Sequence, residues 1–328
     1  MIRYIIKRLL TIIIVLLCVA IIVFTIMHFA PGDPVGLALG DIYTEEQYAA
    51  KAAELGLDQP FLVQLWVFIR NIFMRFDFGT SWVLKTHVGT ELFARLPRTL
   101  TLAGISCILE ILIGIPLGIT AATHKGGFVD KFCIFLAMVG ISLPGFWIAL
   151  MMILLFSNTL GWLPSSGVDH WYCYIMPCIA NALTGIGGLT RVTRSQMLEV
   201  INADYVVTAR AKGVPERTIL YSHALPNALI PVVTHVGTHF ATAIGGSVVI
   251  ETVFSIPGIG FYITQSLGNR DYPIVTGGVT LLALIFCIII LLIDILYAYI
   301  DPRIKAQYES SGKSRKVKRA LKAKGAAA

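Results

Sequence analysis

The chain has 328 residues, of which 56% are hydrophobic and only 14% are charged, and its formal net charge is +7. Soluble domains are about 45–50% apolar and roughly 25% charged, so this composition excludes an ordinary soluble protein. The apolar residues are gathered in long stretches, which is typical of a membrane protein.

Six stretches contain either no Asp, Glu, Lys or Arg or a single acidic residue. A membrane-spanning helix needs about 20 mostly apolar residues, and each stretch supplies that number. Because the stretches show no strand-like alternation, helices are favoured over a barrel. The sequence predicts an all-α integral membrane protein with six transmembrane helices, within Leu9–Gly32, Thr99–His124, Phe132–Val168, His170–Thr190, Thr218–Ile250 and Tyr272–Ala298.

The first of these helices lies in segment 1–30, whose basic start resembles that of a secretory signal. The apolar part exceeds the usual length of about 7–15 residues and no small-x-small cleavage site follows, so we expect a retained helix. Cytoplasmic segments are enriched in Lys and Arg. Placing both termini in the cytoplasm puts most of the 26 Lys and Arg residues there. The basic tail 306–328 is predicted to be disordered and attracted to anionic lipid.

The segment between the first two helices, residues 31–98 and called the outer lobe below, is too long for a simple connection. Thr44 and Gln47 form a capping-box pattern that predicts a helix ending at Gly56. A second helix is predicted over Pro60–Arg75. Its apolar side suggests an amphipathic lobe resting on the membrane face, where it meets a partner from outside; that side comprises Phe61, Leu65, Phe68 and Ile72.

The inner segment 191–227 predicts a short helix over Ala203–Lys212, a turn at Gly213 and a second short helix from Pro215. This outline resembles a DNA-binding helix-turn-helix. A DNA reader needs a third helix and free access to a groove, however, and this segment is tethered to the membrane at both ends, so nucleic acid is not expected as a partner. We expect instead a rigid knob that fits a groove of a cytoplasmic partner. Its predicted apolar anchors are Tyr205, Val206, Ile219, Leu220 and Tyr221.

The same segment carries a family motif. Residues 207–209, Gly213 and residues 223–226 are spaced as in the cytoplasmic coupling loop of binding-protein-dependent ABC importer permeases. That motif reads Glu-Ala-Ala, three residues, Gly, nine residues and Ile-x-Leu-Pro. Here Val207 stands at the glutamate position and His223 at the isoleucine position, so the match is partial.

Further stretches resemble the peptide/nickel branch of these permeases, which includes the dipeptide, oligopeptide and glutathione types. The stretches follow one another in the family's order over nearly all of residues 1–305. Each is a weak match alone, and the resemblance rests on all of them together. They include "PGDP" at 31–34, "LGLDQP" at 55–60, "DFGTS" at 77–81, "LGWLPSSG" at 160–167, "DYVVTARAKGV" at 204–214 and "GGSVVIETVFSIPGIG" at 245–260.

The resemblance implies a bundle like that of a type I ABC importer permease, with a five-helix core over 99–305 and a cytoplasmic coupling helix. It also implies a multi-pass protein of the cell membrane. The implied partners are a second, homologous permease, two cytoplasmic ATPase subunits and an extracytoplasmic solute-binding protein.

The chain itself is not expected to be an enzyme, because it lacks the phosphate-binding G-x-x-x-x-G-K-[ST] loop. ATP and Mg²⁺ would therefore be bound by the ATPase subunits, and no cofactor is expected in this chain. The coupling residues implied by the resemblance are Asp204, Tyr205, Ala209, Arg210, Ala211, Lys212, Gly213, His223, Leu225 and Pro226.

Two acidic residues fall inside predicted membrane helices, where an ionisable group costs about 2.5–3.5 kcal/mol on insertion scales. Asp294 is expected to pair with a basic residue or a helix end, whereas Glu110 either pairs or lines the transport pathway. His235 and His239 lie four residues apart on one helix face, as two metal ligands can. Hydrogen bonding between helices is favoured over a metal site, because a stable cage would trap the transported ion.

Small residues in the second, fourth and fifth helices predict close helix approach, for example at Gly114 and Gly118. Helices rich in small residues often border transport routes, so helices three to five are predicted to line the pathway. Replacing Gly187 or Gly245 by Leu is expected to abolish uptake without blocking membrane insertion. The predicted lining residues are Glu110, Asn181, Gly187 and Gly245.

The sequence thus favours the permease of an ATP-driven peptide importer. A nickel or glutathione importer of the same family remains open, as does a channel or membrane scaffold that works without ATP. An intramembrane enzyme is disfavoured, because no nucleophile and base occur in a recognisable motif.

Overall fold

A computed structural model describes residues 2–40 and 42–300, and within them the chain is helical. The one pairing of strand type in this part is an isolated antiparallel bridge between Thr80 and His87. The predicted all-α membrane class is confirmed. Residues 301–328, which include the predicted basic tail, lie outside the described residues.

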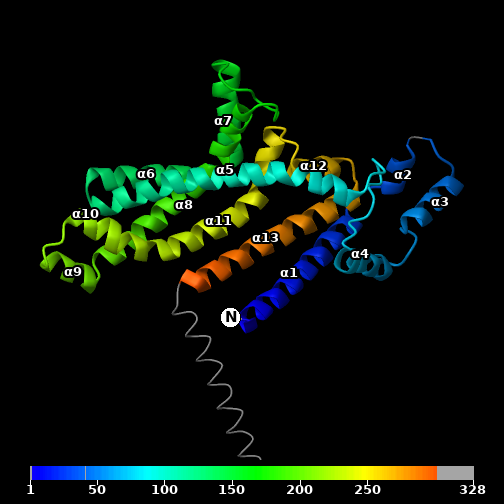
Figure 1. Ribbon diagram of the computed structural model, residues 1–328. Coiled ribbons are helices and arrows are strands. Elements are labelled where there is room, and N and C mark those ends of the chain that lie inside the picture. Colours follow the sequence, from blue (N-terminus) through cyan, green and yellow to red (C-terminus); the bar gives the residue numbers. More distant parts are fainter. Residues whose placement is uncertain (1, 41, 301–328) are drawn as a thin grey trace, which may run out of the picture.

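Five helical segments are long and apolar enough to cross a membrane, and the number rises to six if a bent helix pair counts as one span. They run roughly side by side in Figure 1. The helices at the centre of these segments are α1 (Ile2–Phe29), α5 (Val88–Thr123), α8 (Ile175–Ile201), α11 (Leu225–Val253) and α13 (Tyr272–Ile300).

The third predicted span is wrong as a single straight helix. Its residues form α6 (Phe128–Ser142), α7 (Gly145–Met152) and the π-helical η1 (Ile153–Thr159), with a bend of 96° between α6 and the α7–η1 pair. The bend follows from Pro144, which lacks a backbone N–H and forces the preceding residue out of the helical region. Leu143 is accordingly extended (φ −86°, ψ 128°). As a result, α7 projects sideways from the bundle (Figure 1).

The core of the bundle is α8 packed against α5, α6 and α11. The predicted close approach of small residues is confirmed for α5. A Cβ atom at Gly118 would lie 2.5 Å from Thr193 Cβ, and one at Gly114 would lie 3.0 Å from Leu189 Cβ, so these glycines allow the helices to touch.

The outer lobe contains α2 (Pro34–Leu39), α3 (Glu45–Leu55) and α4 (Phe61–Arg75), and α5 begins within it. The predicted capping box is confirmed, because Gln47 N–H donates to Thr44 Oγ1 and Thr44 N–H donates to Gln47 Oε1. Gly56 ends α3 in the left-handed conformation. Both predicted helices of the lobe are therefore present.

The inner segment differs from its prediction after the turn. α9 (Asp204–Ala211) matches the first short helix, but the second is not separate. α10 (Glu216–Thr218) leads through a π-helical segment, η3 (Ile219–Ala224), directly into α11. Glu216–Val253 thus forms one continuous helical run. The π-helical segment precedes Pro226, whose ring disrupts regular α-helical bonding.

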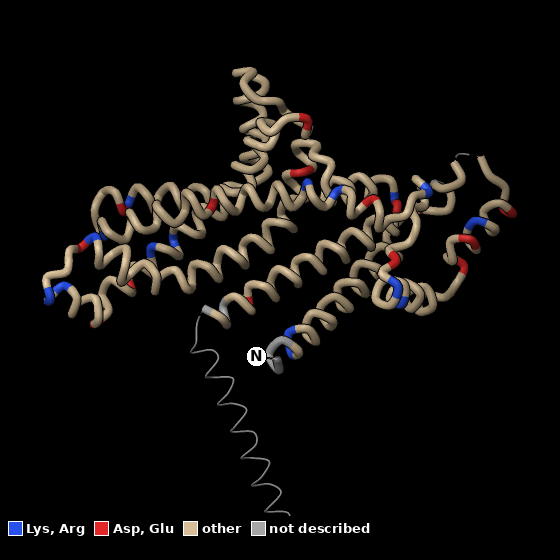
Figure 2. Tube along the Cα trace, viewed as in Figure 1, with Lys and Arg blue, Asp and Glu red and all other residues tan. Residues whose placement is uncertain are grey.

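The sequence analysis also missed α12 (Ile259–Gly268), a short helix between α11 and α13. In Figure 1, α9 and α10 lie toward one end of the molecule, and α2 and α3 lie at the other. The start of α1 and the end of α13 point away from the outer lobe. Figure 2 shows few charges along the middle of the long helices, while Lys and Arg gather near α9 and α10.

Candidate functional site

The first candidate site is the foot, defined here as residues 203–225, which projects beyond the ends of the long helices (Figure 1). Its first helix begins after the extended residue Ala203 and carries Asp204 in the first turn, where a negative charge favours the helix. The helix ends at Ala211, and the turn after it passes through Gly213, whose φ of +77° suits glycine. The sequence thus specifies a short helix followed by a sharp turn.

An ion pair closes this turn. Arg210 Nε lies 3.0 Å from Glu216 Oε2, and Arg210 Nη2 lies 2.6 Å from Glu216 Oε1, so the guanidinium holds the carboxylate at two points. Arg210 Nη1 also donates to the Ile201 carbonyl at 3.4 Å. One side chain therefore joins the end of α8, helix α9 and the start of α10.

The foot is held from beneath by apolar side chains. Val206 and Ile219 are fully buried, and Ala224 packs in a cluster with Met197, Ala122 and Ala228. The predicted anchors Tyr205 and Tyr221 are wrong as buried apolar contacts, because both side chains are exposed. Leu220, the remaining predicted anchor, is half-buried.

A hydrogen-bond cluster fixes the base of the foot. Asn227 Nδ2 donates to Tyr205 Oη at 3.0 Å and to the His223 carbonyl at 2.9 Å. Sequence reasoning missed both Asn227 and Glu216, since neither belongs to the family motif. A sequence signal for the Arg210–Glu216 pair does exist: an arginine precedes a glycine turn, and an acidic residue follows that turn.

The structure brings the motif residues together at this one end of the molecule. Most of them are accessible to a partner, and the exposed apolar surface between them comes from Tyr205, Val207 and Tyr221. The exposed motif residues are Asp204, Tyr205, Arg210, Ala211, Lys212, Gly213, His223 and Pro226, and the half-buried ones are Ala209 and Leu225.

A second candidate site lies inside the bundle at Glu110, whose residue is 1% exposed. His239 Nδ1 lies 2.8 Å from Glu110 Oε2, and the His235 ring stacks on that of His239 with centroids 6.4 Å apart. A Cβ atom at Gly185 would lie 2.6 Å from Glu110 Oε2. Glycine at this position in α8 therefore makes room for a pair formed between α5 and α11.

The other predicted lining residues do not join this pair. Asn181 Nδ2 donates to Ser106 Oγ at 3.2 Å, which binds α8 to α5. Gly187 faces α6, where a Cβ atom would collide with the Ala137 carbonyl oxygen. Gly245 is exposed on α11, and no atom lies within 4 Å of where its Cβ would be. The four residues thus occupy separate places, and their assignment to a pathway stays a prediction.

The expected pairing of the second intramembrane acid is confirmed. Asp294 Oδ1 on α13 lies 2.9 Å from Arg8 Nη2 on α1. In residues 2–40 and 42–300, no group of three His, Cys, Asp or Glu side chains is arranged to hold a metal ion. His239 contacts Glu110 on α5, whereas the ring contact of His235 is with His239 on the same helix.

Two buried acids outside the predicted site residues join separate helices. Asp130 accepts from Arg194 Nε at 2.6 Å and from Arg194 Nη2 at 2.7 Å, joining the start of α6 to α8. Glu251 Oε2 accepts from Phe261 N–H at 3.0 Å and so caps the start of α12. No local sequence signal marks these partners, because each pair is separated by ten residues or more.

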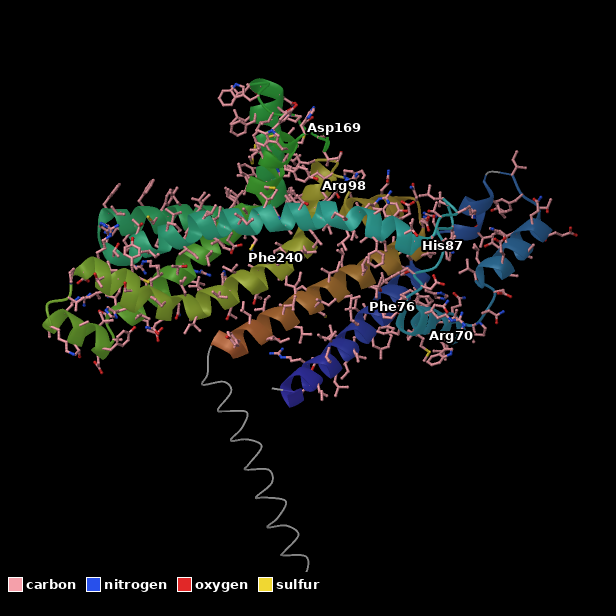
Figure 3. The ribbon with its side chains drawn as sticks, viewed as in Figure 1. Arg70, Phe76, His87, Arg98, Asp169 and Phe240 are labelled. Carbon is pink, nitrogen blue, oxygen red and sulfur yellow. The ribbon has the colours of Figure 1, made fainter. Side chains whose placement is uncertain are left out.

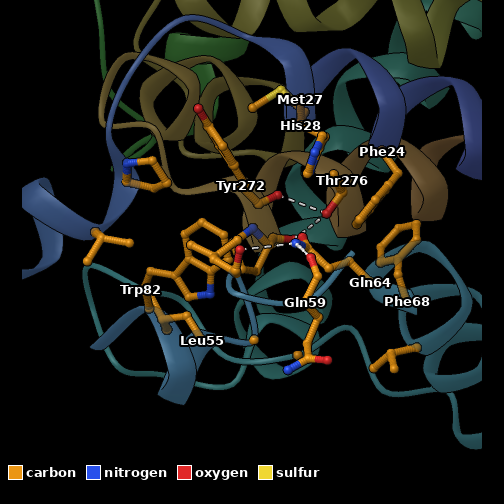
Figure 4. Close-up of a pocket in the computed structure, with 18 of the residues that line it drawn as sticks. Phe24, Met27, His28, Leu55, Gln59, Gln64, Phe68, Trp82, Tyr272 and Thr276 are labelled. Carbon is orange, nitrogen blue, oxygen red and sulfur yellow. Dashed lines mark hydrogen bonds between the residues drawn. The ribbon is translucent and has the colours of Figure 1, made fainter. Parts of the chain in front are cut away.

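A cavity of about 710 Å³ lies in the outer lobe, between the outer end of α1, helices α3 and α4, and the start of α13 (Figure 4). Aromatic side chains such as Phe68 and Trp82 line it together with amides such as Gln64. Tyr48 Oη donates to Asp33 at 3.1 Å, and this hydrogen bond raises the pKa of Tyr48. The cavity lies apart from the Glu110 pair.

Comparison with known families matches nearly the whole chain. The family described as "Binding-protein-dependent transport system inner membrane component" matches residues 114–306. The N-terminal part of the membrane component of such systems matches residues 1–103.

Curated relatives cover almost the full length. The glutathione transport system permease protein GsiC of Salmonella typhimurium (strain LT2) is 41% identical over 305 residues, which cover 93% of this chain and 99% of the relative. A putative peptide transport system permease protein of Brucella abortus (strain 2308) is 43% identical over 309 residues, covering 92% and 98%.

Solved structures share the fold at low identity. The inward-facing MetNI methionine ABC transporter matches with a TM-score of 0.53 and 18% identity, over 64% of this chain and 96% of that chain. An amino acid ABC transporter with histidines matches with a TM-score of 0.50 and 15% identity, over 66% and 94%. These likenesses show the fold alone.

Proposed function

Since this chain belongs to the family of binding-protein-dependent transport system inner membrane components, we propose that it passes short peptides inward as the permease of an ATP-driven importer. The observation that carries the substrate class is the identity of 41% and 43% to a glutathione and a putative peptide permease, over more than nine-tenths of the chain. Glutathione is itself a tripeptide, so both names describe the same substrate chemistry.

Uptake by cells tests the substrate class. In a strain lacking the protein, uptake of labelled dipeptides or glutathione is expected to fall to background and to return when the chain is supplied. Nickel uptake in the same strain is expected to stay unchanged. Loss of nickel uptake alone, with peptide uptake intact, would contradict the proposal.

ATP is hydrolysed by two partner subunits that bind the foot, which places the foot, the start of α1 and the end of α13 in the cytoplasm. Support comes from the exposed Tyr205, Val207 and Tyr221 on a foot whose buried side chains hold it rigidly to α8 and α11. A short amphipathic helix seated in a groove is a common way for proteins to associate.

Copurification tests this contact. Tyr221→Asp places a charge on the exposed face, so the ATPase subunits are expected to be lost from the purified complex while the permease still accumulates. Tyr43→Asp in the outer lobe is the matched control and is expected to retain them. Retention of the ATPases by Tyr221→Asp, or conduction of solute by the isolated chain without ATP, would contradict the proposal.

A second, related permease completes the pathway by packing against the projecting α7 and the open face of α11. The α7 surface is apolar on several sides, with Phe146, Trp147 and Leu150 exposed. Gly245 leaves open space on α11. A solute-binding protein delivers peptide at the opposite end, where the outer lobe presents the charged helix α3.

A further inference from the structure

Helix α4 of the outer lobe carries apolar side chains on more than one side. Phe68 and Ile72 face the cluster that joins α1, α5, α12 and α13, and Phe73, near the end of the helix, also packs against it. On a different side, Leu62 is 73% exposed and Trp66 is 59% exposed. The polar side chains Gln64 and Asn71 line the cavity of the outer lobe, so the exposed side at Leu62 and Trp66 is left apolar.

The depth of α4 is set by ring contacts with α1. The Phe24 ring lies 5.0 Å from that of Phe68 and 5.9 Å from that of Phe61, and the His28 ring lies 5.0 Å from that of Phe61. Phe24 precedes the last residue of α1, Phe29, by about 7.5 Å at 1.5 Å rise per residue. The first half of α4 therefore sits at the level of the last turns of the membrane-spanning helix α1.

The surface of α1 is also apolar and exposed at this level. Ile22 and Ile26 of α1 are largely exposed, as Leu62 and Trp66 are on α4. Both isoleucines lie two residues from Phe24, so they are on the side of α1 that faces away from α4. The charges of α4 are confined to its second half, at Arg70 and Arg75. Figure 3 labels Arg70 and, just beyond α4, Phe76.

The neighbouring helix α3 has the opposite character. It carries Glu45, Glu46, Lys51 and Glu54, and it has no buried residue. Two helices of one lobe thus differ sharply in polarity, as expected when one lies in lipid and the other in water.

We infer that α4 is an interfacial helix embedded in the outer leaflet of the bilayer, with Leu62, Val63, Trp66 and Met74 in contact with lipid. Trp at the membrane–water interface and basic residues reaching the headgroups are typical of such helices. The outer lobe is then anchored at its base while α3 stands free above the membrane. This inference is independent of which solute is carried.

Photocrosslinking in whole cells tests the inference on the assembled protein. The photoreactive residue p-benzoylphenylalanine is placed at position 66 in cells whose phospholipids carry a radiolabelled acyl chain. Irradiation is expected to attach labelled phospholipid to the chain from position 66. The same residue at position 22 of α1 is the positive control, and at the exposed position 50 of α3 it is the negative control.

Three outcomes overturn the inference while position 22 still reacts. An adduct from position 66 to another protein shows that a partner covers α4, the absence of any adduct shows water, and a lipid adduct at position 50 removes the contrast between α3 and α4. Position 62 repeats the experiment if the chain altered at 66 fails to accumulate. Peptide uptake in the unaltered strain is measured separately, so failure here leaves the proposed function standing.

Discussion

Glu110 is enclosed by residues of three helices, with His239 2.8 Å from one carboxylate oxygen and Gly185 beside it. Inside a bundle, a polar group that loses its partner keeps the full cost of its removal from water. Removing one residue of the pair is therefore expected to cost more stability than the contact itself contributes, because the remaining polar group stays buried without a partner. Its neighbour His235 stacks on His239 and extends the polar region along α11.

Glu110→Ala and His239→Ala should each lower thermal stability, because each leaves a buried polar group without its partner. We expect a loss of about 1–3 kcal/mol in each case, seen as a lower midpoint of thermal aggregation in detergent. The double variant should lose less than the sum of the two, since the residues are coupled. Strictly additive losses would show that the two side chains do not interact.

The glycines of α8 and α11 make a second test at the residue scale. The leucine side chain of Gly245→Leu meets open space, so the variant should insert and accumulate normally. We expect it to lose peptide uptake, because the added side chain lies on the face of α11 assigned to the pathway. Gly187→Leu would collide with the backbone of α6, so reduced accumulation is expected as well as lost uptake. Normal uptake by Gly245→Leu would remove that residue from the pathway.

At the scale of elements, the foot owes its shape to the turn between α9 and α10. The turn needs Gly213 for its backbone conformation and the Arg210–Glu216 pair to hold the two helices at a fixed angle. Both side chains are partly open to water, so the pair adds little to the free energy of folding, and its main effect is to fix the angle between α9 and α10.

Reversal of the charges tests this arrangement. Arg210→Glu places two carboxylates beside each other and should lower peptide uptake several-fold without changing the amount of protein in the membrane. The combined variant Arg210→Glu with Glu216→Arg should recover most of the uptake. A double variant no better than the single one would mean that Arg210 acts through a partner subunit rather than through Glu216.

At the scale of the whole molecule, polarity divides the structure into an end with the foot, a long apolar middle and an end with the outer lobe (Figure 2). The apolar stretches and the Thr44 capping box were predictable, because membrane length and helix capping act locally. The Pro144 bend was missed because apolar content was counted across a proline. The Arg194–Asp130 pair was unpredictable, because tertiary packing alone brings its partners together.

Labelling from one side of the membrane tests the orientation of the whole molecule. Lys212→Cys in the foot should react with an impermeant maleimide in inside-out vesicles and resist it in right-side-out vesicles. Ala50→Cys in the outer lobe should show the reverse. Equal labelling of Lys212→Cys from both sides, or labelling from the outside only, would contradict a cytoplasmic foot.

The continuity of α10, η3 and α11 has a mechanical consequence. A run of 38 residues from Glu216 to Val253 is about 57 Å long at 1.5 Å per residue, and its far end carries the Glu251 contact with α12. A movement of the foot can therefore be transmitted along this run to its outer end. If the run moves as one body, a tilt of about 5° taken over that length swings the outer end by roughly 5 Å; the π-helical segment and Pro231 are the places where it can bend instead.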